Sequence, residues 1–395
     1  MLKIPFYKAS IDQAEIDAVS DVLRSGWLTT GPRTREFEAE FARYIGQSHA
    51  VAVNSCTAAL HLALEAIGVR SGDGVLVPAM TFAATAEVVR YFDANPLLVD
   101  CNDADFNLDV RHAEQVLLAA QARGQRVVAI IPVHYGGQIC DMAAVRRLAD
   151  THGLKIIEDA AHCCPAFYRE KDGPWKSVGA EADISCYSFY ANKTITTGEG
   201  GMACTNQAGL ADRMRIMALH GISKDAWKRF TAEGSWYYEI VAPGFKYNLT
   251  DIASAIGLVQ LRKADALHQR RSALAQRYAD ALSGVSEVIV PTAHVDRIHS
   301  WHLFAIRLRL ERMNINRADF IEQLKLRGIG CSVHWMPLHM HPYYREKYGF
   351  ARDDFPTAAR LFDEIISLPL FPDMAPAEVD YVVGEIKLLI DSHRR

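Results

Sequence analysis

Two acids follow an apolar run in a place where they could meet a bound molecule. Ile156 and Ile157 lead directly into Glu158 and Asp159, at the expected carboxyl end of a strand. Open α/β sheets bind their ligands at that edge, so an acid there could serve a ligand. It could also cap a following helix, and for an isolated Glu-Asp pair the capping interpretation is at least as strong.

A lysine follows the next apolar run. Lys193 lies after residues 184–189 and before Gly198, Gly200 and Gly201. Small residues let the backbone approach a bound group closely. Most lysines are ordinary surface residues, but the neighbours of Lys193 argue against that interpretation here.

A third stretch is rich in small residues, two of which carry hydroxyl groups. Ser55, Cys56 and Thr57 lie where an apolar run ends and a helix is expected to begin. Free N–H groups and the positive end of a helix dipole suit a phosphate at such a point. An ordinary helix cap would give the same pattern, and the chain has no GxxxxGK[ST] loop, so this signal is weak by itself.

Together the three stretches supply what pyridoxal phosphate (PLP) needs. PLP requires a phosphate cradle, an anion for its ring nitrogen and an amine for its aldehyde. The acid would keep the ring nitrogen protonated, so that the ring accepts electrons from a substrate carbanion. The lysine would form the resting imine and move a proton between carbon atoms. The sequence therefore predicts a PLP site at Lys193 and Asp159.

Strands and helices alternate along the part of the chain that carries these residues. Apolar runs of strand length occupy residues 50–53, 75–78, 96–100, 127–133, 155–159 and 184–189, and helical patterns include residues 57–67, 85–91 and 142–152. This alternation predicts an α/β fold with a mainly parallel sheet covered on both faces. An amphipathic helix that opens at Ser10 and stops at Gly26 should precede the sheet.

The C-terminal part has a different pattern. Residues 250–282 read as almost wholly helical, with Gly257 as the only expected breaker before Gly284. Beyond them, strands at 302–308 and 331–335 mix with helices at 317–326 and 375–390, as in a small α+β domain. We therefore expect a large PLP-binding domain over residues 1–250 and a small C-terminal domain over residues 251–395 that contains the long linking helix.

Composition narrows the class of protein. The 395 residues are 50% hydrophobic, which is enough for a large core, and the net charge of -4 gives no basic stripe for nucleic acid. No apolar run could span a membrane and no signal peptide is evident, so we expect a cytoplasmic protein. The 8 cysteines form no CxxC pair, which favours buried free thiols and no metal site.

The sequence resembles the DegT/DnrJ/EryC1/StrS family of sugar aminotransferases, which has the PLP-dependent transferase fold type I of aspartate aminotransferase. The resemblance covers nearly the whole chain. Its motifs are GWLTTGP at 26–32, CTAAL at 56–60, PAMTF at 78–82, PVHYG at 132–136, EDAAH at 158–162, Ser188, Lys193, GEGG at 198–201, YNLTD at 247–251 and SLPLFP at 367–372.

This resemblance implies a role for each matching residue. It assigns the Schiff base to Lys193 and the pyridine nitrogen to Asp159, with Phe82 stacked over the ring and His162 beside the ring near its phenolic oxygen. The phosphate would be held by Thr57, Ala58 and Ser188, together with Asn248 from the neighbouring subunit. The active unit would then be a homodimer with shared active sites.

Two departures from the family pattern bear on these assignments. Cys56 stands where many relatives have glycine, and a positive φ at that position would strain a cysteine. Other members have alanine there, so we expect the backbone amide to work unchanged. Cys163 and Cys164 after His162 are also unusual and, if partly exposed, would make the enzyme sensitive to oxidation.

The resemblance also indicates a substrate class, with L-glutamate as amino donor. Residues 27–32, 245–251, 300–304 and 367–372 look like the enzyme that aminates a UDP-4-keto-pentose for 4-amino-4-deoxy-L-arabinose, whereas residues 234–239 and 342–345 look like enzymes for UDP-4-keto-6-deoxy-N-acetylhexosamines. We expect amination at C4 of a UDP-linked 4-keto sugar for cell-surface polysaccharide or lipid A, with pentose or hexosamine left open. His334 is a candidate contact for the nucleotide or sugar, and a structural histidine is an equal alternative.

Other classes stay as alternatives. A dTDP-3-keto-sugar aminotransferase would share the same motifs, and a PLP enzyme with different chemistry on amino acids, such as a desulfurase or aldolase, is a further rival. Lys193 argues against the dehydratase branch, in which histidine replaces the lysine. A non-enzymatic PLP-binding regulator is disfavoured because we see no DNA-binding extension.

Overall fold

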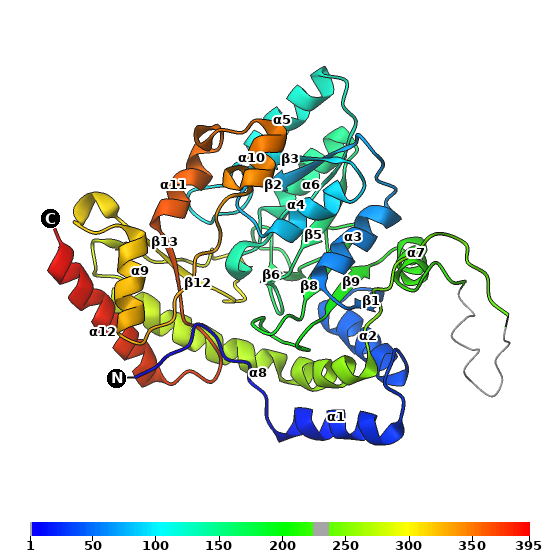
Figure 1. Ribbon diagram of the computed structural model, residues 1–395, viewed down its shortest axis with the longest axis horizontal. Helices are drawn as coiled ribbons and strands as arrows, with labels where there is room; N and C mark the ends of the chain where they lie inside the picture. Colours follow the sequence, from blue (N-terminus) through cyan, green and yellow to red (C-terminus); the bar gives the residue numbers. More distant parts are fainter. Residues whose placement is uncertain (1, 224–236) are drawn as a thin grey trace.

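The computed structural model describes residues 2–223 and 237–395 as an α/β protein built on a mixed central sheet (Figure 1). The 7-stranded sheet has the order β1-β9-β8-β5-β4-β2-β3. Its strands are β1 His49–Val53, β2 Gly74–Pro78, β3 Asn95–Val99, β4 Val127–Ile130, β5 Lys155–Asp159, β8 Ile184–Ser188 and β9 Gly201–Thr205. Only β9 runs against its neighbours among these strands, so the mainly parallel sheet predicted from the sequence is confirmed.

Helices cover both faces of this sheet, because successive strand residues point to opposite sides. Val51 and Val53 face a core with α3 Cys56–Ala66, α4 Ala83–Arg90 and α7 Ala208–Ala218. Ala50 and Ala52 face a second core with α2 Pro32–Ile45, α5 Val110–Ala122 and α6 Met142–His152. The predicted α/β layering is therefore present.

The first helix is α1 Gln13–Ser25. The sequence predicted that it opens at Ser10, but its N-cap lies two residues later. Asp12 is the N-cap and forms a capping box with Glu15, while Gly26 ends the helix at φ 72°. Ser10 instead donates a hydrogen bond to Asp373 at 3.1 Å. The Asp12 carboxylate accepts a 2.9 Å bond from the N–H of Ala14, and Glu15 accepts a 3.0 Å bond from the N–H of Asp12, so this reciprocal pair sets the start of the helix.

The long helix α8 Asp251–Leu282 is continuous, so the expected break at Gly257 is wrong. A Cβ at Gly257 would lie 2.7 Å from Phe37 Cζ and 3.0 Å from Thr197 Cγ2. Glycine is therefore present to let α8 pack closely against α2 and the 190s loop, and packing outweighs its low helix propensity. In Figure 1, α8 runs below the sheet, between α1 and the C-terminal helix α12 Pro376–His393.

The C-terminal part contains a small sheet of order β10-β12-β13. Its elements are β10 Val288–Ile289, β12 Phe304–Leu308, β13 Ile365–Leu368, α9 Arg317–Leu326, α10 Pro342–Tyr348 and α11 Pro356–Glu364. The three strands and α9 share a core with the end of α8 and with Ile4, whereas α10 and α11 pack into the core of the larger sheet. Because Leu303 and Phe355 pack into the core of the larger sheet instead, the division at residue 250 stays a prediction.

The predicted strand at residues 331–335 is wrong. The structure has only an isolated bridge there, between Ser332 and Ser367. The apolar side chains of Val333 and Trp335 pack against the large core rather than against a sheet neighbour. Such packing gives the same alternating pattern as a strand, which is why the sequence favoured one.

The remaining elements are short. A separate sheet has the order β11-β6-β7, with β11 Arg297–Ile298, β6 Phe167–Tyr168 and β7 Lys176–Ser177, and 3-10 turns occur at Tyr135–Gly137, Leu310–Arg312, Leu338–Met340 and Arg352–Asp354. Within residues 2–223 and 237–395, no helix is both long and apolar enough to cross a membrane.

Candidate active site

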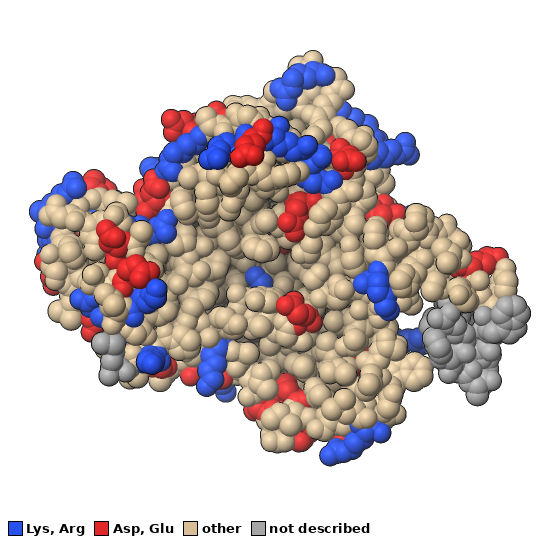
Figure 2. Space-filling view, in the orientation of Figure 1, with Lys and Arg blue, Asp and Glu red and all other residues tan. Residues whose placement is uncertain are grey.

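A cavity of about 460 Å³ opens at the carboxyl ends of the parallel strands. Figure 2 shows the surface hollowed near its centre on this face of the molecule. The cavity brings together seven of the residues predicted from the sequence: Thr57, Phe82, Asp159, His162, Ser188, Lys193 and His334. Ala58 and Asn248 do not line it.

Asp159 ends β5 inside this cavity and is 6% exposed. Its carboxylate accepts a 2.8 Å hydrogen bond from Thr85 Oγ1 and a 3.2 Å bond from the backbone N–H of Ala161. Burial raises the pKa of Asp159. The following residues form a turn, so Asp159 does not cap a helix. No cation forms an ion pair with it among the described residues, and the carboxylate is therefore suited to a cationic ligand atom.

Lys193 faces the same cavity from the loop after β8. Its Nζ lies 3.5 Å from Nε2 of His302. Burial lowers the pKa of Lys193 to about 8, although the nearby Cys56 and Asp159 oppose that shift. The lowered pKa increases the neutral fraction of the amine, and the neutral form is the nucleophile for a carbonyl carbon.

His162 lies in a stack of rings in the cavity. Its ring is stacked on Trp335 with centroids 5.1 Å apart and lies 4.3 Å from the ring of His302. Nδ1 accepts a 3.1 Å hydrogen bond from the N–H of Gly136, so a neutral ring carries its proton on Nε2. Burial lowers the pKa of His162 well below its usual value, which keeps the ring neutral.

His334 enters from the C-terminal part of the chain. Its Nδ1 lies 2.8 Å from Ser367 Oγ, and Phe6 stacks on the ring at 5.5 Å. Burial lowers its pKa to about 4. These contacts fix the ring, and they leave Nε2 available to a ligand.

The small-residue stretch at 55–57 forms the start of α3. Ser55 is the N-cap, and its Oγ accepts a 3.1 Å bond from the N–H of Ala58. Cys56 is the first helical residue and is not among the residues with positive φ, so cysteine is unstrained there, as expected. A Cβ at Gly201 would lie 2.5 Å from the carbonyl of Ser55, so only glycine allows β9 to approach this turn.

Of three further predicted residues, Ser188 and Phe82 line the cavity and Asn248 does not. Ser188 ends β8, and its Oγ accepts a 3.3 Å bond from the N–H of Tyr190. Phe82 precedes α4, and its 59% exposed side chain reaches the cavity mouth. Asn248 lies outside the cavity, where its Nδ2 donates to Thr30 Oγ1 at 2.7 Å and its Oδ1 accepts from Lys246 at 2.6 Å.

Sequence reasoning missed several residues of the cavity, namely Tyr190, Asn192, Glu199, His302 and Trp335. His302 lies 109 residues from Lys193 along the chain, so only the fold shows that the two are neighbours. Nδ1 of His302 and Oδ1 of Asn192 are buried and have no hydrogen-bond partner in the described residues. Asn192 could have been suspected from its place beside Lys193.

The thiols are all free, and none of the eight lies in a disulfide. Cys163 and Cys164 are only 2% and 4% exposed. Burial raises the pKa of both thiols, which disfavours the reactive thiolate. The condition for the expected sensitivity to oxidation, partial exposure, is therefore not met.

The donor set of the cavity fits PLP. A buried amine can meet its aldehyde, and a buried carboxylate without an ion-pair partner can meet its ring nitrogen. The turn at the start of α3 has N–H groups for a phosphate, and Gly201 lies so close that a side chain would fill the cradle. Fold and cavity thus define a PLP-dependent enzyme of the α/β class.

The family is shown by comparison with known proteins. The model of the DegT/DnrJ/EryC1/StrS aminotransferase family matches residues 9–387, and the chain belongs to this family. The spore coat polysaccharide biosynthesis protein SpsC of Bacillus subtilis is 40% identical over 388 residues, which cover 98% of this chain and 97% of SpsC.

Solved structures agree with this placement. A Streptococcus pneumoniae protein described as a sugar aminotransferase, in its PMP form, superposes with a TM-score of 0.90 at 32% identity and covers 99% of this chain and 100% of its own. PseC of Helicobacter pylori, an aminotransferase involved in the biosynthesis of pseudoaminic acid, superposes with a TM-score of 0.87 at 26% identity. The match covers 99% of this chain and 100% of PseC. The protein is therefore a PLP-dependent sugar aminotransferase of fold type I.

Proposed function

We propose that this enzyme transfers the amino group of L-glutamate to the C4 ketone of a UDP-linked 4-keto sugar, for cell-surface polysaccharide or lipid A sugar synthesis. In the overall exchange glutamate becomes 2-oxoglutarate, and the amino group replaces the ketone oxygen. The observation that carries the proposal is the burial of Lys193 and Asp159 in one cavity. The relatives involved in spore coat polysaccharide and pseudoaminic acid synthesis support a sugar as the acceptor.

Lys193 and Asp159 would carry the chemistry. PLP, when bound, supplies an electron sink for the carbon that loses its proton. Asp159, fixed by Thr85 and the N–H of Ala161, would hold the proton on the ring nitrogen through a charge-assisted hydrogen bond. The Nζ of Lys193 would form the covalent link and, when free, accept and return the proton of the donor carbon.

The other cavity residues would hold the cofactor. Phe82 at the mouth would cover one face of the ring, and His162 would lie beside it. The phosphate would bind at the start of α3, where Thr57 and Ala58 lie, with Ser188 from β8. Since Ser55 accepts from the amide of Ala58, the phosphate would share or displace that bond.

We also propose a homodimer in which Asn248 completes the phosphate site of the neighbouring copy. Asn248 does not line the cavity of its own chain, so the proposed contact requires a second chain. The side chains of Ile16 and Leu23 on α1 are 53% and 55% exposed, and Leu28 is 45% exposed. Ile16 and Leu23 are seven residues apart and therefore lie on the same face of α1, and exposed apolar side chains grouped on one face are typical of a surface that another protein covers.

His334 is our candidate contact for the nucleotide or sugar, because its ring is fixed by Ser367 and Phe6 while it lines the cavity. The sugar of the acceptor, a pentose or a hexosamine, is left open in this proposal. Of the stretch 234–239 that resembles the hexosamine enzymes, residues 234–236 lie outside the described residues. A dTDP-3-keto sugar is the alternative acceptor.

Two organisational proposals accompany this function. Residues 1–250 would form the large cofactor-binding domain, and residues 251–395, beginning with α8, the smaller one. We place the enzyme in the cytoplasm, where its eight free cysteines would stay reduced.

The donor half of the proposal can be tested with glutamate alone. We expect L-glutamate to convert the bound cofactor of the wild-type enzyme to its pyridoxamine form and to release 2-oxoglutarate. Lys193→Ala should bind PLP without the absorption of the lysine-linked cofactor and should not react. Lys325→Ala, a change at a lysine whose side chain is 71% exposed, should behave as wild type. Normal turnover by Lys193→Ala would refute the assignment.

A further inference from the structure

A second, much smaller cavity shares Asn192 and Lys193 with the active-site cavity. Its volume is about 10 Å³, and it is lined by Ser10, Asn192, Lys193, Gln260, Arg271 and Pro372, among others. A volume of about 10–15 Å³ on this measure holds one water molecule when polar partners surround it. The cavity therefore has the size of a single-water site, next to the lysine of the active site.

Arg271 of α8 lines this cavity and carries a donor that no described residue uses. The residue is 3% exposed, and its Nη1 donates to the carbonyls of Leu370 at 2.9 Å and Trp301 at 3.5 Å. Its Nε is buried without a hydrogen-bond partner, and no acid forms an ion pair with Arg271 among the described residues. Leaving a charged donor buried and unpaired is costly, so an acceptor for Nε is expected.

Asn192 brings the matching acceptor. It precedes Lys193 and lines both this cavity and the active-site cavity. Its Oδ1 is buried and has no donor within the described residues. The walls of this cavity thus include one residue with an unpaired buried donor, on α8, and one with an unpaired buried acceptor, on the loop that carries Lys193.

We propose that one water molecule binds in this cavity, accepts a hydrogen bond from Arg271 Nε and donates one to Asn192 Oδ1. Arg271 is thereby a positioning residue for Lys193, acting through the water and Asn192. The functional part of this inference rests on the proposed role of Lys193, whereas the water site itself does not.

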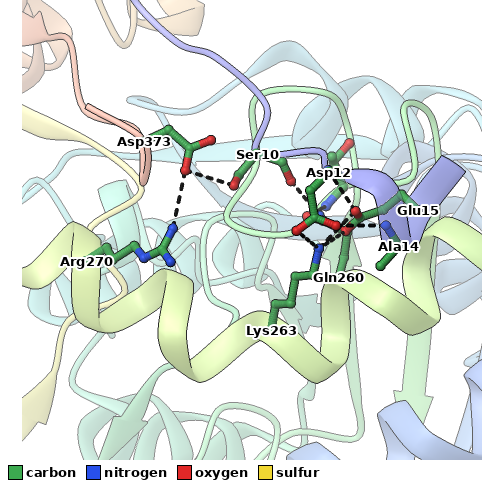
Figure 3. Close-up of polar contacts among 9 residues, drawn as sticks. Ser10, Asp12, Ala14, Glu15, Gln260, Lys263, Arg270 and Asp373 are labelled. Atoms are coloured by element: carbon green, nitrogen blue, oxygen red, sulfur yellow. Dashed lines mark hydrogen bonds and ion pairs between the residues drawn. The ribbon is translucent and has the colours of Figure 1, made fainter. Parts of the chain in front are cut away.

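The same helix already holds the other end of the loop. Gln260 Oε1 accepts a 3.4 Å bond from the N–H of Thr196, three residues beyond Lys193. Its Nε2 donates to the carbonyl of Ser10 at 2.8 Å and to Glu15 at 2.7 Å, and Lys263 contacts Glu15 at 2.9 Å (Figure 3). With the bridge from Arg271 to Asn192, α8 would fix the loop on both sides of the lysine.

The water is tested first by a crystal structure of the wild-type holoenzyme and of Asn192→Ala. We expect one ordered water within hydrogen-bond distance of Arg271 Nε and Asn192 Oδ1 in the wild type. In Asn192→Ala, which lacks the acceptor, that water should be displaced or lost. A direct bond between Arg271 and Asn192, or no water in the wild type, would overturn the proposal.

The positioning role is tested by a double-mutant cycle with Asn192→Ala and Arg271→Lys, which keeps the charge. The readout is the rate at which added PLP develops the absorption of the lysine-linked cofactor. Each single variant should be slower by about tenfold, a modest loss for a displaced reacting group. The double variant should be no slower than either, because both changes break the same bridge. Additive losses would overturn the role.

Arg270 offers a matched control, one residue away on the same helix. Its side chain is 61% exposed and pairs with Asp373 on the surface (Figure 3). Arg270→Lys should leave the rate of cofactor linkage unchanged, and an equal loss there would contradict a specific role for Arg271. If Lys193→Ala kept full turnover while the wild-type water was present, the proposed function would fail but the water site would stand.

Discussion

Burial moves the pKa values of Lys193 and Asp159 toward each other. It lowers that of Lys193 to about 8 and raises that of Asp159. A lysine with a pKa of about 8 is roughly one-tenth neutral at pH 7, compared with about one part in 2,500 for an ordinary lysine. The cavity therefore prepares the amine to link to a carbonyl, and it leaves a carboxylate that a protonated ring nitrogen would stabilise as an anion.

Asp159→Asn tests the role of the buried carboxylate. The variant should fold and bind PLP, because the amide fits the same space beside Thr85. It should transaminate slower by on the order of a hundredfold, since a neutral amide cannot keep the ring nitrogen protonated. The rate of cofactor conversion by glutamate in a single turnover measures this effect.

Asp183→Asn is the control for that variant. Asp183 is also buried and pairs with Lys155 at 2.9 Å, but it does not line the active-site cavity. It should lose stability without losing the conversion rate. If Asp159→Asn converted the cofactor as fast as wild type, the carboxylate would have only a structural role.

Residue types in order along the chain were enough to predict Lys193 and Asp159, because each follows its own strand at the ligand edge of the sheet. His302 and Trp335 could not be found in this way. They come from the C-terminal part, and their contact with His162 depends on how that part packs on the sheet. The bond from the N–H of Ala58 to Ser55, in contrast, is the ordinary helix cap that the sequence pattern also allowed.

At the scale of elements, patterns of period 2 and 3.6 predicted most strands and helices of the large sheet. These patterns gave wrong predictions at glycines that are present because two elements pack closely together. Gly200 and Gly201 were expected to let the backbone approach a bound group, yet β9 begins at Gly201, where only glycine clears the backbone of Ser55. Gly257 was expected to break α8 because glycine has a low helix propensity. The helix instead continues, and glycine is needed there because a side chain would collide with Phe37.

Gly257→Ala tests this explanation. Alanine gains about 1 kcal/mol of helix propensity, but its Cβ would press on buried Phe37, and overpacking costs about 1–3 kcal/mol. We expect a net loss of about 1 kcal/mol in the free energy of unfolding, seen as a lower melting temperature. Gly384→Ala in α12 is the control, because an added Cβ there meets nothing within 4 Å. It should raise the melting temperature, and the same rise in Gly257→Ala would contradict the close packing.

At the scale of the whole molecule, the cavity of one chain lacks the predicted contribution of Asn248. We expect a homodimer by sedimentation. Lys193→Ala and Asn248→Asp should each be impaired as pure dimers, the second because a carboxylate would repel the cofactor phosphate. Co-expression of the two chains should restore activity, since a mixed dimer has one site with both native residues. No restoration, or a fully active monomer, would contradict a shared site.

The proposed amination at C4 of a UDP-linked keto sugar can be tested in the acceptor half-reaction alone. The pyridoxamine form of the wild-type enzyme is mixed with UDP- and dTDP-linked 4-keto and 3-keto sugars, and the return of the PLP absorption is followed in time. We expect UDP-linked 4-keto sugars to restore the absorption fastest, because a site built around one ketone position misplaces the other. Preferential reaction with a dTDP-linked 3-keto sugar would contradict both the position and the nucleotide that we propose.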